Sequence, residues 1–407
     1  MHGPAVAGTI RAVTDEPKHH HERQVAASHS VTPLELFFDL VFVFALTQVT
    51  ALLATDLTWM GMLRGFAVLA VVWWAWVGYA WLTNSIRIDD DISSRLVMLM
   101  AMAAMLVVGL AAPEAFGDAS IVFGVAYLIV RLLHVTLYAV TTRNDPDVFR
   151  AVRRLAPGMV LGATLILIAG FVPAGPVRAV LWGVAIIIDV GAPLLTGTGG
   201  WKVDASHFAE RHGLIIIIAL GESLVALGIG ALDAEFTPGV IAAITMGVVI
   251  VSAMWWLYFD VVAIVAERVL ESLTGSARAA MARDSYSYIH FFMIWGIVLV
   301  ALGLKKTLLD VDYPLKAIAA VALFGGLAMY LVAHVAFRRR NVGTVNVQRV
   351  VVAVALLVMV PVGMNVPALT SITVATTLMV GLVIFEVARY RGLRHEVRQH
   401  HGEVPGG

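Results

Sequence analysis

Twelve stretches of this chain are each about 20 residues long and mostly apolar, and this feature limits the possible folds most strongly. A helix needs about 20 apolar residues to cross roughly 30 Å of hydrocarbon. Inside lipid, moreover, every backbone amide must find its partner within the chain. The sequence therefore predicts an all-α, polytopic transmembrane helix bundle of about 12 spans. The predicted spans are residues 34–55, 61–82, 94–112, 119–141, 153–171, 176–196, 207–231, 238–260, 284–304, 313–337, 347–364 and 367–389.

The composition excludes several classes of protein. Hydrophobic residues make up 60% of the chain and charged residues 14%, whereas soluble domains are roughly 45–50% apolar and about 25% charged. The 28 Lys and Arg residues balance the 28 Asp and Glu residues, so no positive field predicts a nucleic-acid partner. Because the chain has no cysteine, disulfides, thiolate metal sites and thiol catalysis are excluded. The standard phosphate-binding, zinc-protease and serine-hydrolase motifs are missing as well.

The distribution of positive charge predicts the orientation, because cytoplasmic loops of membrane proteins are enriched in Lys and Arg. With a cytoplasmic N-terminus, 21 of the 28 Lys and Arg residues fall in inner segments. The outer segments hold Arg64, Arg178, Lys305, Lys306 and Lys316. Both termini are therefore predicted to be cytoplasmic. The predicted organisation is a polar tail (1–33), a first six-helix unit (34–200), a second six-helix unit (201–390) and a second polar tail (391–407).

The two halves share a sequence pattern. In the first span residues 35–48 read ELFFDLVFVFALTQ, and in the seventh residues 210–222 read ERHGLIIIIALGE. With one residue dropped, each reads Glu, Leu, four bulky apolar residues and Ala-Leu, and ends on Gln48 or Glu222. Because six spans separate the matches, both halves have the same orientation, and we predict a parallel 6+6 repeat about an axis along the membrane normal. Further matches six spans apart are Trp73-Trp74 with Trp255-Trp256, and His134 with His334.

Ionisable residues inside the predicted spans are candidate functional residues, because each costs about 2.5–3.5 kcal/mol on insertion scales unless it finds a partner or water. At ~1.5 Å per residue, Glu222 and Arg131 lie near the middle of the bilayer. Glu35 and Asp39 share one helix face, where their like charges repel unless a cation or proton lies between them. We predict that substrate or protons bind among these residues and further polar groups of the same spans. The candidates are Glu35, Asp39, Gln48, Arg131, Asp189, Glu210, Arg211, Glu222 and His290.

Each of these groups also has a structural interpretation. Glu222 would then form a permanent pair with Arg131, and Glu35 would cap a helix. Most of the ten tryptophans are assigned to an interfacial belt, which is also the default for Trp73, Trp74 and Trp76. For Trp73, Trp74 and Trp76 the alternative is a place in the wall of a ligand pocket.

Two segments resemble the signatures of the bacterial low temperature requirement A (LtrA) family. They are Leu34–Val43, reading LELFFDLVFV, and His207–Ser223, reading HFAERHGLIIIIALGES. The resemblance implies a multi-pass bacterial membrane protein, and with it a place in the cytoplasmic (inner) membrane. It implies no substrate and no catalytic residue. His212 departs from the pattern, which has an aromatic residue such as Phe there. The signature positions are Glu35, Asp39, Glu210, Arg211, Gly213, Gly221 and Glu222.

The sequence favours a transporter or permease for a small solute, with protons as the candidate coupling ion. A duplicated bundle with short loops and intramembrane carboxyls suits such a function. One alternative is an intramembrane metal- or cofactor-binding enzyme that uses the histidines and carboxylates. The other is a stress or signalling membrane protein that carries nothing across. No cofactor is predicted, the predicted partners are the lipid bilayer and the solute, and the metal content and oligomeric state stay open.

Overall fold

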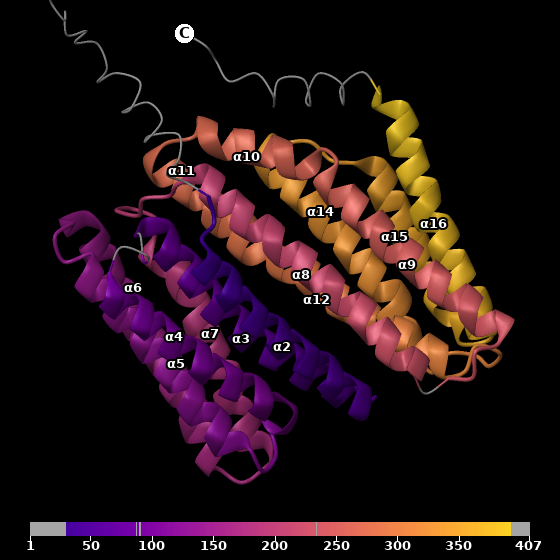
Figure 1. Cartoon of the computed structure of the whole chain (residues 1–407), viewed down its shortest axis with the longest axis horizontal. Coiled ribbons are helices and arrows are strands. Elements are labelled where there is room, and N and C mark those ends of the chain that lie inside the picture. The colour runs from indigo at the N-terminus through magenta and orange to yellow at the C-terminus, as the bar shows by residue number, and fades with distance from the viewer. Residues whose placement is uncertain (1–29, 87, 89–90, 233, 392–407) are drawn as a thin grey trace, which may run out of the picture.

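The computed structural model describes residues 30–86, 88, 91–232 and 234–391, and this part of the chain is built from helices without any β-strand. Figure 1 shows two groups of helices that follow one another along the sequence, with their axes roughly aligned. The first group contains α2 (Pro33–Thr55), α3 (Trp59–Ser85), α4 (Ile92–Ala111), the 3-10 helix η2 (Ala112–Glu114), α5 (Ser120–Thr141), α6 (Pro146–Phe171) and α7 (Pro176–Thr196). The second contains α8 (Ala205–Leu232), α9 (Pro238–Phe259), α10 (Val262–Ser272), α11 (Gly275–Met281), the π-helix η3 (Ala282–Ile289), α12 (His290–Leu309), α13 (Ala317–Ala320), the π-helix η4 (Val321–Gly325), α14 (Gly326–Val342), α15 (Val347–Gly363) and α16 (Ala368–Arg389).

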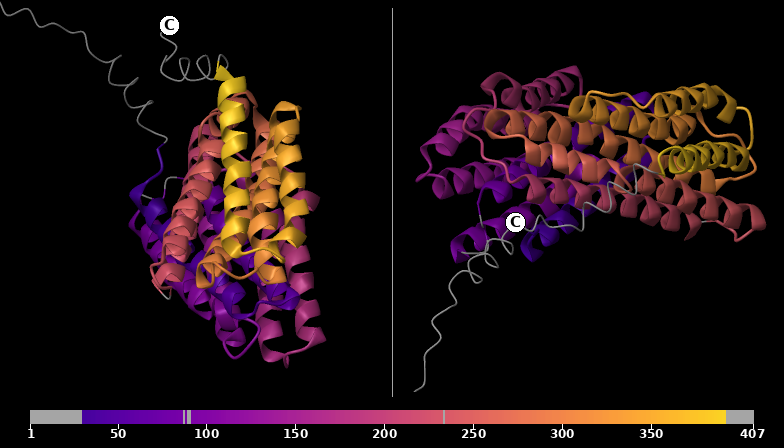
Figure 2. Two further views of the ribbon diagram at one scale, coloured as in Figure 1. Left: turned by 90° about the vertical axis from the view of Figure 1, so that its right-hand side faces the viewer. Right: turned by 90° about the horizontal axis from the view of Figure 1, so that it is seen from above.

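The helices confirm the predicted polytopic bundle. Within the described residues, 11 helical segments are long and apolar enough to cross a membrane, and one shorter apolar helix is Val347–Gly363. That helix has 17 residues, which is the lower end of the length that spans hydrocarbon. The start of α2 and the end of α16 lie at the same end of the bundle (Figures 1 and 2), as an even number of crossings requires. Most of the two predicted polar tails, residues 1–29 and 392–407, lies outside the described residues.

Polar residues at the ends of the spans fix where several helices begin. At α2, the Glu35 N–H donates to the Thr32 hydroxyl at 3.3 Å, and the Thr32 N–H donates to the Glu35 carboxylate at 2.9 Å. This reciprocal arrangement is a capping box, so the predicted capping role of Glu35 is confirmed. At α4, Asp91 accepts hydrogen bonds from Ser93 and Ser94, which lower the pKa of this exposed carboxyl to about 2. Such caps satisfy amides that the first turn of a helix leaves unpaired.

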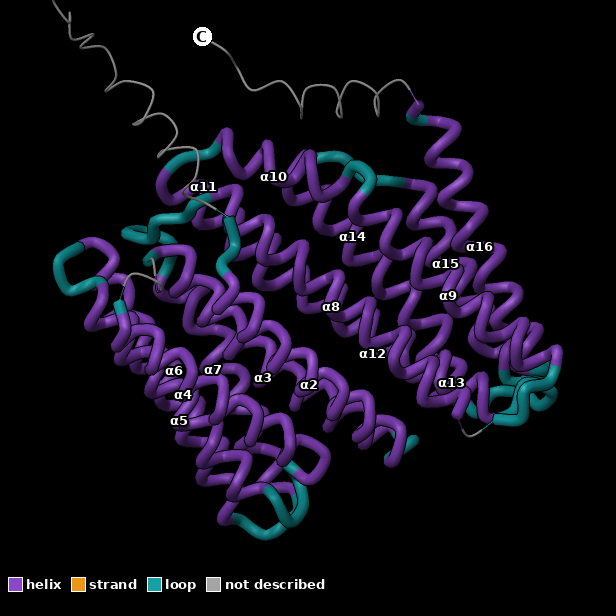
Figure 3. The backbone as a smooth tube through the Cα atoms, in the orientation of Figure 1, coloured by secondary structure: helices purple, strands orange, loops and turns teal. Residues whose placement is uncertain are grey.

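The helices pair in the same order in the two halves. α2 packs on α3 and α4, α4 on α5, α5 on α6, α6 on α7, and α3 on α7. Likewise α8 packs on α9 and α12, α12 on α14, α14 on α15, α15 on α16, and α9 on α16. The path of the chain through each set can be followed in Figure 3. A parallel repeat predicts this shared order, and the repeat itself stays a prediction.

The two tryptophan pairs that the repeat matches lie in different surroundings. Trp73 is 0% and Trp74 5% exposed, whereas Trp255 is 44% and Trp256 39% exposed. Trp76 is also fully buried, and its indole stacks on that of Trp73 with ring centres 5.0 Å apart. The assignment of Trp73, Trp74 and Trp76 to an interfacial belt is therefore wrong, because α3 is enclosed by other helices along most of its length.

Glycine allows α12 to lie against the turn of chain that leads into α14. A Cβ added at Gly303 would lie 2.6 Å from backbone atoms of Leu323, and one at Gly296 would lie 2.8 Å from the carbonyl of Gly326. Small residues at such crossings let two transmembrane backbones approach closely. Because the atoms in the way belong to the backbone, they cannot move aside as a flexible side chain would.

We expect Gly303→Ala to lower the thermal unfolding temperature of the purified chain in detergent. Overpacking of this kind costs about 1–3 kcal/mol. Gly228→Ala is the matched control, because a Cβ at Gly228, on α8, meets nothing within 4 Å. The control should unfold at the wild-type temperature or slightly above it, since alanine favours helix over glycine. Equal unfolding temperatures for the two variants would contradict the close crossing.

Candidate functional site

A buried ionic network lies where the first helices of the two halves meet. Arg211, on α8, donates from its two terminal nitrogens to Glu35 and to Asp39, each at 2.7 Å, and all three side chains are buried. Glu35 and Asp39 both lie on α2, so one guanidinium supplies the cation that their like charges were predicted to need. The guanidinium also donates to the Thr83 hydroxyl at 3.0 Å and lies 5.7 Å from the centre of the Trp76 ring. The network therefore joins α2, α3 and α8.

His207 adds a second donor to Glu35. Its Nε2 lies 3.1 Å from Oε2 of Glu35, and its Nδ1 lies 3.1 Å from the amide nitrogen of Asn84. The amide oxygen of Asn84 accepts from the N–H of Asp204 at 2.9 Å, so the Asn84 amide nitrogen faces His207 and donates to Nδ1. The proton of the neutral imidazole is therefore on Nε2, which donates to Glu35.

Two polar atoms of the network lack a hydrogen-bond partner among the described residues. Trp76 donates to Oδ1 of Asp39 at 2.8 Å, the same oxygen that Arg211 contacts. Oδ2 of Asp39 and Nε of Arg211 are buried without a hydrogen-bond partner among the described residues. Buried polar atoms are rarely left unpaired. This carboxylate oxygen is therefore a place where a proton or a polar molecule would be accepted.

Glu222 lies further along the same interface, 17 residues after α8 begins at Ala205. At ~1.5 Å per residue this is about 26 Å along the helix. The residue is 3% exposed, and its carboxylate accepts a hydrogen bond of 2.5 Å from the hydroxyl of Thr47, on α2. The interface bonds at both levels join residues 172 to 176 positions apart, so α2 and α8 run parallel. Gln48, the predicted repeat partner, is half-buried beside Thr47.

The alternative that pairs Glu222 with Arg131 is wrong, because Arg131 is bound within the first half. Arg131, on α5, forms a buried ion pair with Asp189, on α7. Tyr127 donates to the other carboxylate oxygen of Asp189 at 2.9 Å, and Arg131 donates to the carbonyl of Trp74 at 3.2 Å. Both charges thus point into the bundle, as the cost of leaving them in lipid predicts.

The second half contains a similar group that the sequence analysis missed. Arg349, on α15, donates to Glu386, on α16, at 2.7 and 2.9 Å, to Nδ1 of His334 at 2.7 Å, and to the carbonyl of Leu257 at 3.2 Å. Each half therefore holds a buried arginine bonded to a carboxylate of its last helix and to a carbonyl of its second helix. The available signal was a carboxyl in the last predicted span of each half, Glu386 in the twelfth and Asp189 in the sixth.

His290 lies outside the networks of Arg211, Arg131 and Arg349 and comes directly after the π-helix η3. Its Nδ1 lies 2.9 Å from the carbonyl of Ser285 and donates to it, so Nε2 accepts from the hydroxyl of Tyr258 at 2.9 Å. The ring centre of His212 lies 5.4 Å away. Among the residues that the structure describes, no group of three or more His, Cys, Asp or Glu is placed to hold a metal ion. The enzyme alternative gains no ligand set from this cluster.

Glu210 is exposed, and it accepts a hydrogen bond of 3.2 Å from the N–H of Val31. Of the predicted candidates, the structure thus brings four to the interface of α2 and α8, two to a separate pair in the first half, and leaves three outside these groups. In that order they are Glu35, Asp39, Arg211 and Glu222; Arg131 and Asp189; and Gln48, Glu210 and His290.

The segments that meet at this interface are those that resemble the LtrA signatures. Residues 30–384 match the family described as bacterial low temperature requirement A protein (LtrA). The chain belongs to the LtrA family. An uncharacterized protein of Rhizobium meliloti (strain 1021) is 31% identical over 314 residues, which cover 73% of this chain and 74% of the relative. No solved structure is significantly similar to the chain. LtrA membership, together with the apolar helices, makes this a multi-pass membrane protein.

Proposed function

We propose that this LtrA protein transports a small solute across the bacterial cytoplasmic membrane and that the transport is coupled to protons. The observation that carries the proposal is the buried carboxyl of Glu222, whose hydrogen bond comes from the hydroxyl of Thr47 in the opposite half. An ionised carboxylate inside a membrane costs several kcal/mol. A structural contact with one hydroxyl does not need an ionisable group, because a neutral amide could accept the same hydrogen bond. Intramembrane carboxyls are typical of proton relays in transporters.

The α2–α8 interface suits a change between two conformations. At one end of this interface, Arg211 of the second half holds Glu35 and Asp39 of the first. Deeper in the membrane, Thr47 and Glu222 form a second polar contact between α2 and α8. Transporters with repeated halves move by rocking one unit against the other around a central site. In our proposal the Arg211 network closes one end, and loss or gain of a proton at Glu222 changes how tightly the halves hold together.

The orientation forms part of the proposal. With both termini in the cytoplasm, the Arg211 network lies near the cytoplasmic end, because Arg211 is the seventh residue of α8. The arginine-rich end of α14, Arg338–Arg340, then also lies in the cytoplasm, in accord with the positive-inside rule.

The test is uptake by liposomes that contain the purified protein. Vesicles with and without an imposed pH gradient are given a mixture of bacterial small metabolites, and their contents are measured by mass spectrometry. We expect at least one solute to accumulate only where both the protein and the gradient are present. If folded protein causes no accumulation under either condition, the proposal fails.

A further inference from the structure

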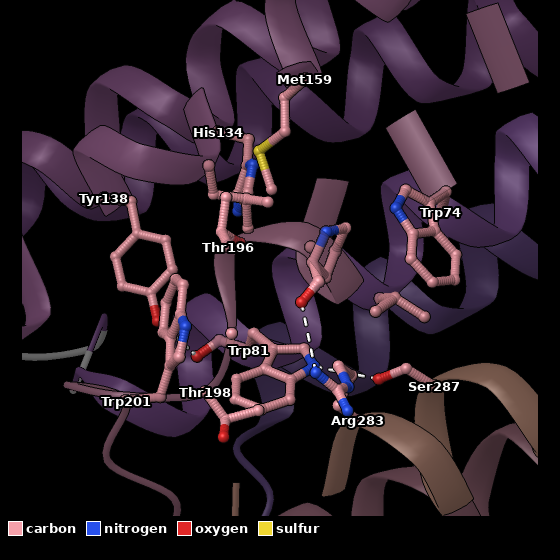
Figure 4. A pocket seen from close by; sticks show the side chains of 15 residues that line it. Trp74, Trp81, His134, Tyr138, Met159, Thr196, Thr198, Trp201, Arg283 and Ser287 are labelled. Carbon is pink, nitrogen blue, oxygen red and sulfur yellow. Dashed lines mark hydrogen bonds between the residues drawn. The ribbon is translucent and has the colours of Figure 1, made fainter. Parts of the chain in front are cut away.

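A small cavity opens between the first half and the start of η3, away from the α2–α8 interface. It encloses about 50 Å³ and is lined by residues from α3, α5, α6, α7 and the segment after α7. Figure 4 shows its walls, in which three indole rings, a phenol ring and an imidazole surround the space. These aromatic residues are Trp74, Trp81, Trp201, Tyr138 and His134.

His134 has no hydrogen-bond partner in this wall. Its side chain is buried, with the residue 2% exposed, and neither ring nitrogen has a partner among the described residues. Its counterpart in the second half, His334, is equally buried, but Nδ1 of His334 is 2.7 Å from a nitrogen of Arg349. A buried polar group without a partner costs about 1–3 kcal/mol. An imidazole that stays unpaired beside a cavity therefore points to a polar partner that occupies the cavity.

The other polar groups of the wall, apart from the indole N–H of Trp201, are already bonded within the protein. Trp81 donates to the Ser287 hydroxyl at 3.0 Å, and Trp74 donates to the carbonyl of Asp189 at 2.9 Å. The Tyr138 hydroxyl is shared with Ser85 at 2.7 Å. What remains for a ligand is aromatic surface, the indole N–H donor of Trp201 and one imidazole, which in its neutral form offers one donor and one acceptor.

The lining offers a cation no partner, because no carboxylate belongs to the described residues that line the cavity. The charged residue of the lining is Arg283, which pairs with Asp284 at 2.7 Å. Arg131 also lies behind His134, since a Cβ added at Gly78 would be 3.0 Å from the imidazole and 3.3 Å from that guanidinium. Aromatic rings attract one another edge to face, by about 0.5–1.5 kcal/mol beyond the area they bury.

We propose that this cavity binds a small, uncharged, planar aromatic molecule with one hydrogen-bonding group, which His134 contacts. The enclosed volume is smaller than the roughly 150 Å³ that takes up benzene, so the ligand enters by one edge. Its remainder lies in the mouth beside Trp201 and Thr198, which are half-buried where the chain passes from α7 to α8. This site is separate from Glu222 and does not rest on the proposed transport activity.

The test uses phenol as the probe and the thermal unfolding temperature of the full chain in detergent as the readout. A ligand that binds the folded state raises this temperature in a saturable way. Cyclohexanol matches phenol in its hydroxyl but lacks the aromatic ring, and benzylamine adds a positive charge. We expect phenol to give a saturable rise, and the other two compounds to give none at the same concentrations.

Two matched variants assign the effect to the cavity. His134→Phe replaces the imidazole by a ring of similar shape that cannot form a hydrogen bond. We expect it to weaken phenol binding roughly tenfold, since a lost hydrogen bond of about 1.4 kcal/mol corresponds to that factor. His212→Phe makes the same change at a buried histidine that does not line the cavity and should leave phenol binding unchanged. If His134→Phe does not fold, Trp201→Leu takes its place, because Trp201 lines the cavity from the segment between α7 and α8. We expect it to weaken phenol binding by a similar factor. Equal responses to phenol and cyclohexanol, or an unchanged phenol response in the cavity variant, would overturn the proposal.

Discussion

Replacing Arg211 by leucine is expected to lower the free energy of unfolding by about 3–5 kcal/mol, the usual cost of removing one partner from a buried ion pair. The variant leaves Glu35 and Asp39 inside the bundle without the guanidinium that holds both at 2.7 Å. The measurement is thermal and denaturant unfolding of the purified chain in detergent. Arg211→Lys should recover only part of the loss, because an ammonium cannot present the two parallel donors of a guanidinium.

Two controls separate charge from packing in this experiment. Glu210→Gln changes an exposed neighbour on the same helix and should leave stability within about 0.5 kcal/mol of wild type. Combining Arg211→Leu with Glu35→Gln and Asp39→Asn removes the uncompensated charges and should restore much of the lost stability. An Arg211→Leu variant as stable as the wild type would show that the network does not hold α2 against α8.

Glu222→Gln is expected to abolish the dependence of uptake on the pH gradient while the protein still folds. The amide is nearly the same size as the carboxyl, and its oxygen can still accept the Thr47 hydrogen bond. Its unfolding temperature should therefore stay close to that of wild type, whereas the proton-binding group is gone. The measurement is solute uptake and unfolding temperature on one preparation.

The matched control for this prediction is again Glu210→Gln, the same substitution at an exposed position of α8. It should keep full coupling. A Glu222→Gln protein with unchanged pH dependence would end the proposed role of Glu222. A variant that loses activity only together with its fold would assign Glu222 a structural role instead.

The spans and the helix starts could be predicted because they depend on local sequence. Apolar windows give the number and approximate limits of the helices, since the bilayer sets the length. Thr32 followed by Glu35 three positions later is a capping pattern that can be read from the chain alone. Part of the chemistry at the interface could also be predicted, because Glu35 and Asp39 on one helix face require a cation or a proton between them.

The partners of buried groups could not be predicted, because they depend on which helices pack together. Depth along a helix put Glu222 and Arg131 at one level, but α5 and α8 are not neighbours, and Arg131 pairs with Asp189 instead. The Arg349–Glu386 pair was missed because Arg349, near the start of the predicted span 347–364, is one of the 21 Lys and Arg residues assigned to the inner segments. The burial of Trp73 likewise follows from the central place of α3, which apolar composition does not reveal.

The most direct test of the proposed mechanism is to measure distances between the halves at both ends of the bundle by double electron–electron resonance. The chain has no cysteine, so paired cysteines for spin labels can be introduced at exposed positions without background. Arg143 with Arg389 reports on the proposed cytoplasmic end, and Asp118 with Asp310 on the opposite end. The account predicts that between acid and alkaline buffer one distance lengthens while the other shortens, and that Glu222→Gln removes this response to pH. Distances at both ends that stay the same in acid, in alkali and in the variant would contradict it.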